Sequence, residues 1–342
     1  MRDYTKKRQL KIVLSVFIVI LFILLVLLSF ELFRVLTKDN VVNETSTDTM
    51  DSDATLNFIE IPETIKVPKE KPGFLPKSFA YVLSDYDMST ASKLRRFDVV
   101  VLDPYNADED FMIEVKSSGS LVLANLDIGK AQNGRNYWSK LDKNILIKPD
   151  QDVDGEFFVD INDESWHNAI INYEIPYIFA LGDSGNETDS YHGYDGLVID
   201  NIDIINDYPE MKTGVYKLIK AISQKYPGLL IVVNRGFDIL PLVYPFADGI
   251  LYEDMCYYYN EGAGRYQSKD SLKEKKVLIN TVRKKQIPVF VLDHISTNPP
   301  NEGSALQCHD MATTYNVQGF NFLWNANSID YELYLWDFLE IK

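Results

Sequence analysis

Eight short apolar runs recur between residues 79 and 325 of this chain, and each ends on a side chain that can do chemistry. The runs are continuous in Val, Ile and Leu rather than alternating with polar residues, which is the pattern of strands in a parallel sheet buried on both faces. In chain order they read FAYVLSDYD, DVVVLD, LVLANLD, GLVID, LLIVVN, GILYE, IPVFVLD and GFNFLWN. Eight strands separated by helix-length connections predict a (β/α)8 barrel.

The connections between the runs fit this prediction. Residues 208–226 place apolar side chains at helical spacing and stop at Pro227–Gly228, and residues 269–285 show a similar pattern. The third connection, between Asp127 and Leu197, is far longer than one helix requires. Long loops at the ends of barrel strands usually shape the substrate cleft, so we expect this connection to contribute to a site.

The sharpest chemical motif is YDGLVIDNID, residues 194–203. Asp200 emerges where the apolar run ends, which is where a barrel carries its active site, and Asn201 and Asp203 follow closely. A carboxylate held by neighbouring polar groups at that position suits a nucleophile or a general base. The alternative is that Asp200 only caps the following helix.

A second carboxylate, Glu253, ends the run GILYE two strands further along the barrel. Two carboxyl groups that face each other across a sugar-sized gap are what glycoside cleavage needs, since one protonates the leaving oxygen and the other attacks or activates water. An ordinary surface role for Glu253 is the alternative. The sequence leaves open whether the separation is about 5 Å, for retention, or about 6.5–9.5 Å, for inversion.

Other polar and aromatic side chains at the predicted barrel mouth can bind sugar hydroxyl or amino groups, or stack on sugar rings. A structural role is equally open for each of them. The predicted substrate-binding residues are Asp85, Asp103, Tyr105, Asp127, Asn201, Asp203, Asn234, Arg235, Tyr252, Asp293, Trp324 and Asn325.

The formal net charge of −16, despite a basic segment at residues 1–11, argues against nucleic acid as a partner. An acidic surface favours solubility, and an acidic cleft also attracts cationic substrates. The four histidines have no zinc-motif spacing, so we expect no metal and no other cofactor.

Residues 12–30 form a run of 19 residues interrupted only by Ser15 and Ser29, which is long enough to cross a bilayer as a helix. The basic flank before it places the N-terminus in the cytoplasm and the remainder outside the membrane. We therefore predict a single-pass membrane protein with an anchor at residues 12–34; a cleaved signal peptide is the alternative. Residues 35–72 have the composition of a flexible linker, and residues 73–342 form the extracytoplasmic barrel.

The chain has two cysteines, Cys256 and Cys308, and both lie near the predicted barrel mouth. Outside the membrane they can form a disulfide. Two unpaired thiols are the equally open alternative.

The motif YDGLVIDNID resembles glycoside hydrolase family 114, the endo-α-1,4-polygalactosaminidases, whose corresponding strand reads GfDGvxxDNxD. Four further segments resemble the family in the same order: LVLANLDIGKAQNGRNYW, GEFFVDINDESW, LLIVVNRGF and DGILYEDMCYYY. The resemblance implies a (β/α)8 fold and hydrolysis of an α-1,4-linked, galactosamine-rich polysaccharide such as those of biofilm matrices. It assigns the catalytic pair to Asp200 and Glu253. One departure is Gln132, where the family often has a Glu.

Our hypothesis for the reaction is that Glu253 acts as general acid/base and Asp200 as nucleophile, with the reverse assignment open. We expect Tyr252 and its neighbours to bury the acid and so raise its pKa. One rival is a membrane-tethered carbohydrate-binding barrel without turnover, which Gln132 keeps open. Another is a metal-dependent polysaccharide deacetylase, but among the predicted mouth residues only His294 could supply the imidazole that such a metal site needs.

Overall fold

The computed structural model describes residues 71–74, 76–83, 86–181, 193–260, 263–294, 302–314, 319–324 and 332–333. All of them belong to the unit Phe58–Lys342, one of two into which the chain divides. The predicted anchor at residues 12–34 and nearly all of the linker lie outside the described residues. Within the described part, no helix has both the length and the apolar character that crossing a membrane requires.

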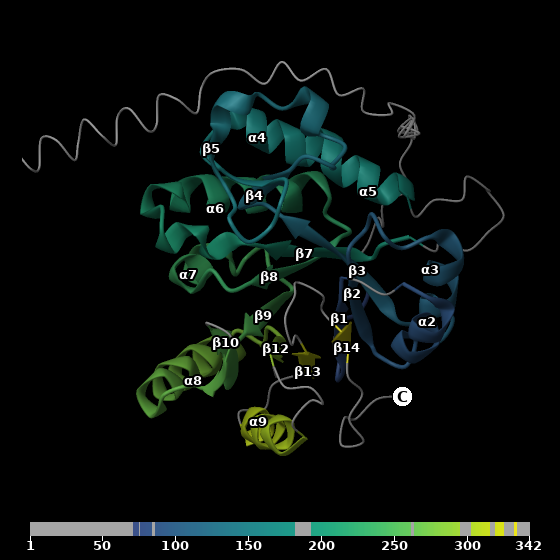
Figure 1. The fold of residues 1–342 in the computed structure, drawn as a ribbon, viewed down its shortest axis with the longest axis vertical. Helices are drawn as coiled ribbons and strands as arrows, with labels where there is room; N and C mark the ends of the chain where they lie inside the picture. Colours follow the sequence, from purple (N-terminus) through teal and green to yellow (C-terminus); the bar gives the residue numbers. More distant parts are fainter. Residues whose placement is uncertain are drawn as a thin grey trace, which may run out of the picture. The chain divides into compact units, whose positions relative to one another are not determined.

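The central sheet contains eight parallel strands that pair with their neighbours in chain order (Figure 1). Each corresponds to one of the eight predicted runs. The short strand β14 (Glu332–Leu333) pairs antiparallel with the last of them, and both contact β1. The sheet is therefore nearly closed, which confirms the predicted parallel barrel. The eight strands are β1 (Phe79–Val82), β2 (Val99–Leu102), β3 (Leu121–Asp127), β7 (Gly196–Asp200), β8 (Leu230–Asn234), β9 (Gly249–Glu253), β12 (Val289–His294) and β13 (Gly319–Trp324).

Helices surround the strands on the outside of the barrel (Figure 1). The helix predicted within residues 208–226 is α6, whose apolar side chains Val215, Leu218 and Ile222 are completely buried against the sheet. It ends before Pro227, as the sequence predicts. Outside the long third connection, the helices are α2 (Met88–Leu94), α3 (Glu109–Lys116), α6 (Lys212–Lys225), α7 (Leu240–Val243), α8 (Lys269–Arg283) and α9 (Glu302–Thr314).

Two apolar layers fill the space on either side of the strands. Alternate strand residues, such as Tyr81, Val198, Leu251 and Leu292, pack together in an inner cluster, while their neighbours along each strand join the cluster shared with the helices. Burial on both faces explains why the runs are continuously apolar. The alternation also decides which strand-end side chains point into the barrel.

The long third connection builds a separate layer beside the ends of β3 and β7. It holds a three-stranded antiparallel sheet in the order β4–β6–β5, followed by two helical segments. The insertion begins in close contact with the loop after β7, since a Cβ on Gly129 would lie 2.3 Å from the Asn201 carbonyl oxygen. Its elements are β4 (Lys130–Gln132), β5 (Leu146–Pro149), β6 (Glu156–Val159), α4 (Glu164–Ala169) and α5 (Ile175–Leu181).

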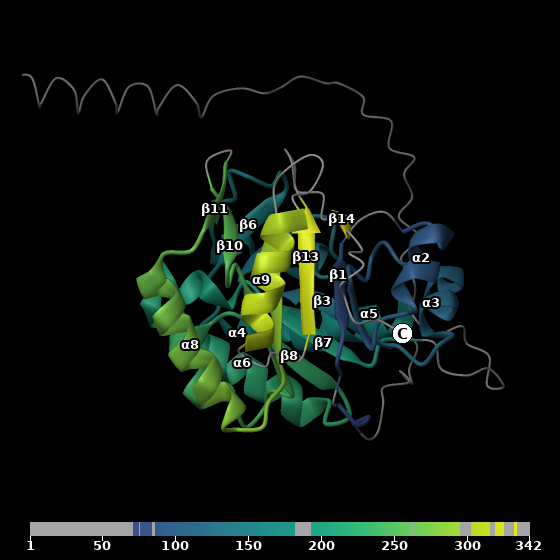
Figure 2. The same ribbon diagram turned by 90° about the horizontal axis from the view of Figure 1, so that it is seen from below.

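A hairpin of β10 (Tyr257–Asn260) and β11 (Ala263–Tyr266) follows β9 (Figure 2). The ring of Tyr257 meets that of Tyr266 edge-on, with centroids 4.9 Å apart. The hairpin therefore extends the chain beyond the strand that carries Glu253.

Candidate active site

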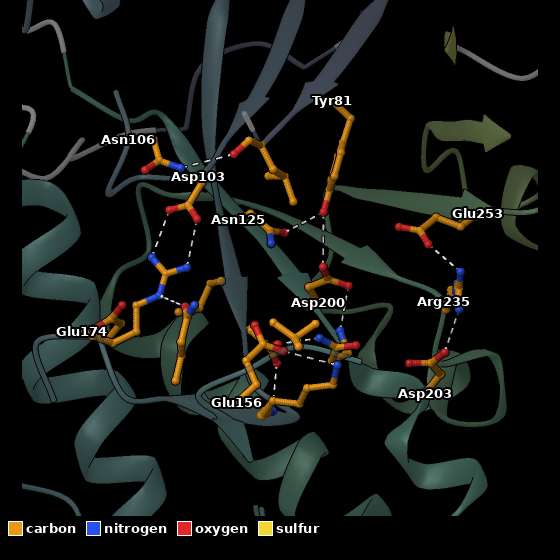
Figure 3. A pocket seen from close by; sticks show the side chains of 18 of the residues that line it. Tyr81, Asp103, Asn106, Asn125, Glu156, Glu174, Asp200, Asp203, Arg235 and Glu253 are labelled. Atoms are coloured by element: carbon orange, nitrogen blue, oxygen red, sulfur yellow. Dashed lines mark hydrogen bonds and ion pairs between the residues drawn. The ribbon is translucent and has the colours of Figure 1, made fainter. Parts of the chain in front are cut away.

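A pocket of about 560 Å³ lies at the carboxyl ends of the strands, between the barrel mouth and the insertion (Figure 3). Its charged lining consists of seven carboxylates and three cations. The carboxylates are Asp103, Asp127, Glu156, Glu174, Asp200, Asp203 and Glu253, and the cations are Lys130, Arg135 and Arg235.

Asp200, the last residue of β7, points into this pocket and accepts three hydrogen bonds. Its Oδ1 accepts from the backbone N–H of Asn201 at 2.7 Å and from Nδ2 of Asn234 at 2.8 Å, and its Oδ2 accepts from the Tyr81 hydroxyl at 3.2 Å. Asn201 adopts a left-handed conformation, with φ 55°, that turns the chain sharply after the strand. The cap position of the following helical turn, Ile202–Asn206, is taken by Asn201, so the alternative of Asp200 as a helix cap is wrong.

Glu253 ends β9 and shares a hydrogen-bond donor with Asp200. Asn234 Nδ2 donates to Glu253 Oε1 at 2.8 Å, the same length as its bond to Asp200. The two acceptor oxygens therefore lie no farther apart than two such bonds end to end, 5.6 Å. Asn234 itself is 2% exposed, so it acts behind the pocket as a brace between the two carboxylates.

The second partner of Glu253 is Arg235, a residue with a left-handed backbone at φ 58°. Its guanidinium group also pairs with Asp203 at 2.9 Å and with Asp254 at 3.2 Å. The charge of Glu253 is the largest cause that raises the pKa of Arg235. One cation is thus shared among three carboxylates.

The prediction that Glu253 packs against Tyr252 is wrong. Tyr252 belongs to the cluster that the strands share with the helices, where its ring lies 4.4 Å from that of Phe237. Because side chains alternate along a strand, Glu253, the next residue, faces inward. Tyr252 packs in the core and does not line the pocket.

Asp127 ends β3 next to Asp200 in the sheet register. Its Oδ1 accepts from the backbone N–H groups of Gly129 and Lys130, both at 2.9 Å, and its Oδ2 accepts from Asn201 Nδ2. Burial, assisted by the charge of Asp200, raises the pKa of Asp127 to about 8. Near neutral pH this carboxyl is therefore largely protonated, unlike a typical strand-end aspartate.

The wall formed by the insertion carries a second polar network. Arg135 binds both oxygens of Asp103, at 2.9 and 3.0 Å, and donates from Nε to Gln132 at 2.7 Å. Its guanidinium carbon lies 4.2 Å from the centre of the Tyr105 ring. Tyr105 in turn donates its hydroxyl to Glu174 at 3.0 Å, so it supports the wall from behind.

Lys130, the third cation of the lining, is also paired. Its ammonium group lies 2.5 Å from Asp150 and 3.4 Å from Glu156. Each pocket cation is thus bound by at least one carboxylate, and negative charge predominates.

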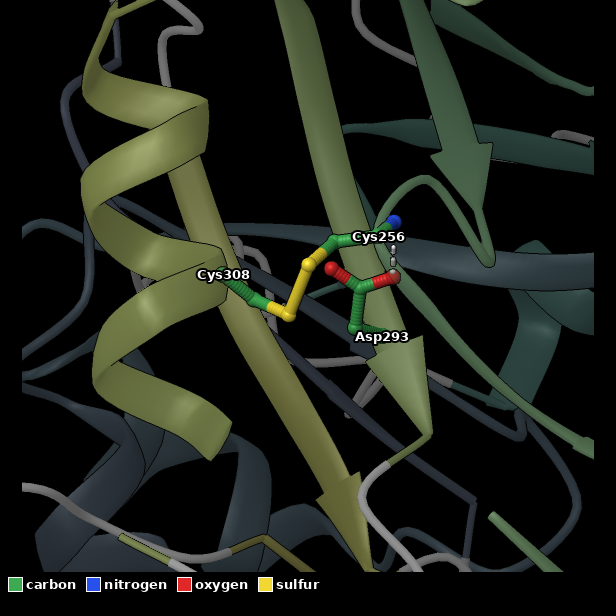
Figure 4. Close-up of side chains that lie close together, drawn as sticks. All are labelled: Cys256, Asp293 and Cys308. Atoms are coloured by element: carbon green, nitrogen blue, oxygen red, sulfur yellow. Dashed lines mark hydrogen bonds between the residues drawn. A yellow bond between two sulfur atoms is a disulfide. The ribbon is translucent and has the colours of Figure 1, made fainter. Parts of the chain in front are cut away.

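Asp293 contacts structural groups rather than the pocket (Figure 4). Its fully buried carboxylate accepts from the backbone N–H groups of Cys256 and Tyr257, at 2.8 and 3.0 Å. A disulfide with a Cα–Cα distance of 5.6 Å joins Cys256 to Cys308 of α9 beside it. The two cysteines and Asp293 form the one candidate metal-ligand group among the described residues, and the disulfide engages both of its sulfur atoms.

Seven of the fourteen predicted site residues line the pocket. Tyr105, Asn234, Tyr252 and Asp293 do not line it. Asp85 and Asn325 lie outside the described residues, as does the side chain of Trp324, whose backbone ends β13. The lining residues that we predict are Asp103, Asp127, Asp200, Asn201, Asp203, Arg235 and Glu253.

Several lining residues escape the sequence prediction. Asn125 interrupts an otherwise apolar run, which is a readable signal of an inward polar group, whereas Tyr81 and Glu174 give none. The additional residues are Tyr81, Leu83, Asn106, Asn125, Leu126, Lys130, Gln132, Arg135, Tyr137, Val153, Glu156 and Glu174.

Comparisons with known proteins agree with this architecture. Two solved structures are similar: the glycoside hydrolase domain of PelA from Pseudomonas aeruginosa and Ega3 from Aspergillus fumigatus in complex with galactosamine. The PelA domain is 17% identical, with a TM-score of 0.60 over 76% of this chain and 98% of that domain. Ega3 is 15% identical, with a TM-score of 0.56 over 79% of this chain and 100% of that one.

At these identities the two structures support the barrel fold. A search among curated proteins finds no match. The model of glycoside hydrolase family GH114 matches residues 63–337, which is most of the chain. This protein therefore belongs to family GH114 and is a glycoside hydrolase.

Proposed function

We propose that this protein is an endo-acting hydrolase of an α-1,4-linked, galactosamine-rich exopolysaccharide. The observation that carries the proposal is the pair Asp200 and Glu253, bridged by Asn234 at the floor of an acidic pocket. Family membership and the likeness to Ega3, which was solved with galactosamine, support the substrate class.

The bridge favours hydrolysis with retention of anomeric configuration. A limit of 5.6 Å between the bonded oxygens of Asp200 and Glu253 fits the roughly 5–5.5 Å of retaining enzymes, whereas inverting enzymes need about 6.5–9.5 Å to admit a water. Asp200 attacks the anomeric carbon while Glu253 gives its proton to the leaving glycosidic oxygen. Glu253 then takes a proton from water, whose oxygen attacks the same carbon and releases Asp200.

The partners of the two carboxylates support this division of roles. Asp200 is held by three uncharged donors, which fix its side chain at the pocket without an ion pair. Glu253 forms an ion pair with Arg235. When Glu253 takes up a proton, Arg235 still has Asp203 and Asp254 as partners. Glu253 is therefore the better candidate for the group that cycles its proton.

The charge of the pocket favours a cationic substrate. Each lining cation is already bound to carboxylate, which leaves an excess of negative charge in a concave site. Such a site attracts and orients protonated amino groups. An amino sugar offers that charge along with the hydroxyl groups of any hexose.

For the location, we propose a single-pass membrane protein with its barrel outside the cytoplasm. The apolar run within residues 12–34, its basic flank and a disulfide, which is typical of oxidising compartments, support this placement. Protease treatment of intact cells should remove a C-terminal tag and leave an N-terminal tag protected. A protected C-terminal tag contradicts the proposal.

The decisive experiment incubates the full chain with deacetylated α-1,4-galactosamine polymer and reads released oligosaccharides by mass spectrometry. We expect oligomers of several sizes from the wild type and none from Asp200→Asn or Glu253→Gln. NMR of the first products should show the α anomer before mutarotation. Polymer binding without release supports the binding-barrel rival instead. Gln132 gives that rival little support, because its side-chain oxygen accepts a hydrogen bond from Arg135, whose guanidinium group binds Asp103.

A further inference from the structure

One wall of the pocket is formed by a helix with an unusually wide turn. Helices α4 and α5 are joined without a break by a π-helical turn, Ile170–Glu174. Pro176 follows two residues later and has no N–H to donate to the carbonyl of Asn172, so a regular α-helical ladder cannot continue there. The N–H of Ile175 accordingly donates five residues back, to Ile170.

Side chains of neighbouring elements donate hydrogen bonds to backbone carbonyl groups of the wide turn. The carbonyl of Ile171, which a regular helix would bond to the N–H of Ile175, accepts the Tyr226 hydroxyl at 2.7 Å. The carbonyl of Tyr173 accepts from Asn136 Nδ2 at 3.3 Å. The turn is thus held from two sides, and such π-turns occur frequently at functional sites.

The residue that this turn delivers to the pocket is Glu174. Its side chain lines the cavity although the residue is only 3% exposed, and Figure 3 shows it and Glu253 on opposite sides of Asp200. Neither Asp200 nor Glu253 contacts it. The reaction as derived above leaves Glu174 without a role.

Glu174 lacks an ion-pair partner among the described residues, where no Lys, Arg or His nitrogen lies within 4.0 Å of its carboxylate. Its contact is the Tyr105 hydroxyl, at 3.0 Å. The nearby guanidinium of Arg135 is already bound to both oxygens of Asp103. Burial raises the pKa of Glu174 to about 7. A buried carboxylate without a bound cation is costly, and a cationic ligand would offset that cost.

We propose that Glu174 is a specificity-determining residue whose carboxylate binds the protonated amine of a hexosamine unit next to the unit that reacts at Asp200. The inference rests on the proposed function, because it assumes an amino-sugar polymer. The lining of the same pocket also offers hydroxyl and amide groups that suit a sugar, and the π-turn, held by Tyr226 and Asn136, keeps the carboxylate in position. An N-acetylated unit lacks the charge and would gain nothing from this contact.

The test compares the wild type with Glu174→Gln in the full chain, on α-1,4-galactosamine oligomers and on N-acetylated oligomers of equal length. The glutamine keeps an oxygen that can accept the Tyr105 hydroxyl, so the wall is preserved. We expect kcat/KM for the amino oligomers to fall about 10- to 100-fold, mainly through KM, as the loss of one charge-assisted hydrogen bond implies. The value for N-acetylated oligomers should stay within twofold. Equal losses on both substrates, or no loss, would overturn the proposal.

Two controls separate a binding role from a structural one. Tyr105→Phe removes the hydroxyl that supports Glu174 but keeps the carboxylate, so its preference for amino oligomers should persist. Glu114→Gln, on α3 and outside the pocket, changes an exposed ion pair with Arg95. This variant should match the wild type on both substrates. Loss of preference in Tyr105→Phe to the same degree as in Glu174→Gln would contradict direct amine binding.

The failure of this inference is distinguishable from that of the proposed function. If the wild type cleaves neither oligomer, the proposed substrate is wrong, and calorimetry with galactosamine and N-acetylgalactosamine still tests Glu174. Tighter binding of galactosamine by the wild type, lost in Glu174→Gln, supports the amine site. The absence of any preference in the wild type overturns it.

Discussion

Aspartates stand at both ends of the same barrel strands, and the two ends use them in opposite ways. Strand β7 shows this most directly, because Asp195 precedes it and Asp200 ends it. Asp195 accepts from the backbone N–H of Val122 at 2.8 Å and from Lys116 Nζ at 2.7 Å. Asp200 faces the pocket with uncharged donors only.

The arrangement at the base of β7 recurs on two other strands. Asp98, before β2, accepts from the N–H groups of Lys77 and Ser78, just before β1. Asp248, before β9, accepts from the N–H of Ile231 at 2.9 Å and from Lys71. Each base carboxylate thus holds the first amides of the neighbouring strand and helps to fix its register.

The difference teaches that position along the strand, rather than residue type, separates structure from chemistry in this fold. Base carboxylates are bound by the chain's own amides and lysines, so they stabilise the barrel. Several mouth carboxylates are instead buried, held by uncharged donors or paired with a shared cation.

The largest expected effect is on activity in Asp200→Asn. Removing the proposed nucleophile should lower kcat/KM at least about 10³-fold, roughly 4 kcal/mol of transition-state stabilisation. The amide retains an acceptor for Asn234 and removes a charge near Asp127, so the free energy of unfolding should stay equal or rise slightly. Initial-rate kinetics and urea unfolding measure the two quantities. A clear loss of stability would remove the contrast between mouth and base.

The disulfide should give the next largest effect, and it sharpens the comparison because it is a structural element near the mouth. The double variant Cys256→Ser, Cys308→Ser should lose about 3 kcal/mol of unfolding free energy, since it frees a long loop in the unfolded chain. The bond ties the segment just after Glu253 to α9, so kcat should fall less than tenfold. Urea unfolding with and without reductant measures the stability. A reductant effect equally large in the double variant contradicts the assignment.

A smaller stability effect is expected at the base in Asp195→Ala. The change leaves the N–H of Val122 and the ammonium group of Lys116, which is only 14% exposed, without their carboxylate. We expect a loss of about 2 kcal/mol in unfolding free energy. The value of kcat/KM should remain within threefold of wild type at temperatures where the variant is folded. A thousandfold loss of activity in the folded variant would place this aspartate with the mouth group.

The sequence predicts the barrel because each strand is a local apolar run that needs no distant information. It predicts Asp200 and Glu253 for the same reason, as local strand ends. It misplaces Asp293 and Tyr252, because a run that is apolar on both faces hides which alternate residues point inward. Leu292 belongs to the inner cluster, so Asp293 faces out, whereas inward Leu251 places Glu253 in the pocket.

The sequence also does not predict the pocket residues that the insertion supplies. Glu174 and Arg135 reach the pocket only because the long connection folds back over the ends of the strands. Pro176 is visible in the sequence as a helix disturbance, but it does not indicate which side chain the resulting π-turn would deliver. Such placements depend on tertiary contacts, including the bond of Tyr226 to Ile171, that no local pattern encodes.

The smallest expected effect is the change in unfolding free energy per pH unit that Asp127 causes. Burial raises its pKa in the folded state from 3.8 to about 8, so ionisation opposes folding. The contribution of protonated Asp127 to the free energy of unfolding is complete below pH 4. It is lost as the pH rises towards 8, at up to about 1.4 kcal/mol per pH unit. In Asp127→Asn that titration is absent, and the Asn201 amide can turn so that its oxygen accepts from the new side chain.

Urea unfolding at pH 5, 6, 7 and 8 should therefore show a shallower decline in Asp127→Asn than in the wild type, by about 1 kcal/mol per pH unit. The raised pKa of Glu174 leaves a residual slope in both proteins. Asp195→Asn is the matched control, because it replaces a carboxylate at the base of the neighbouring strand and keeps Asp127, so the decline that Asp127 causes should persist. Parallel curves for wild type and Asp127→Asn would show that Asp127 is ionised in the folded protein, and the contrast between the two ends would then fail at this residue.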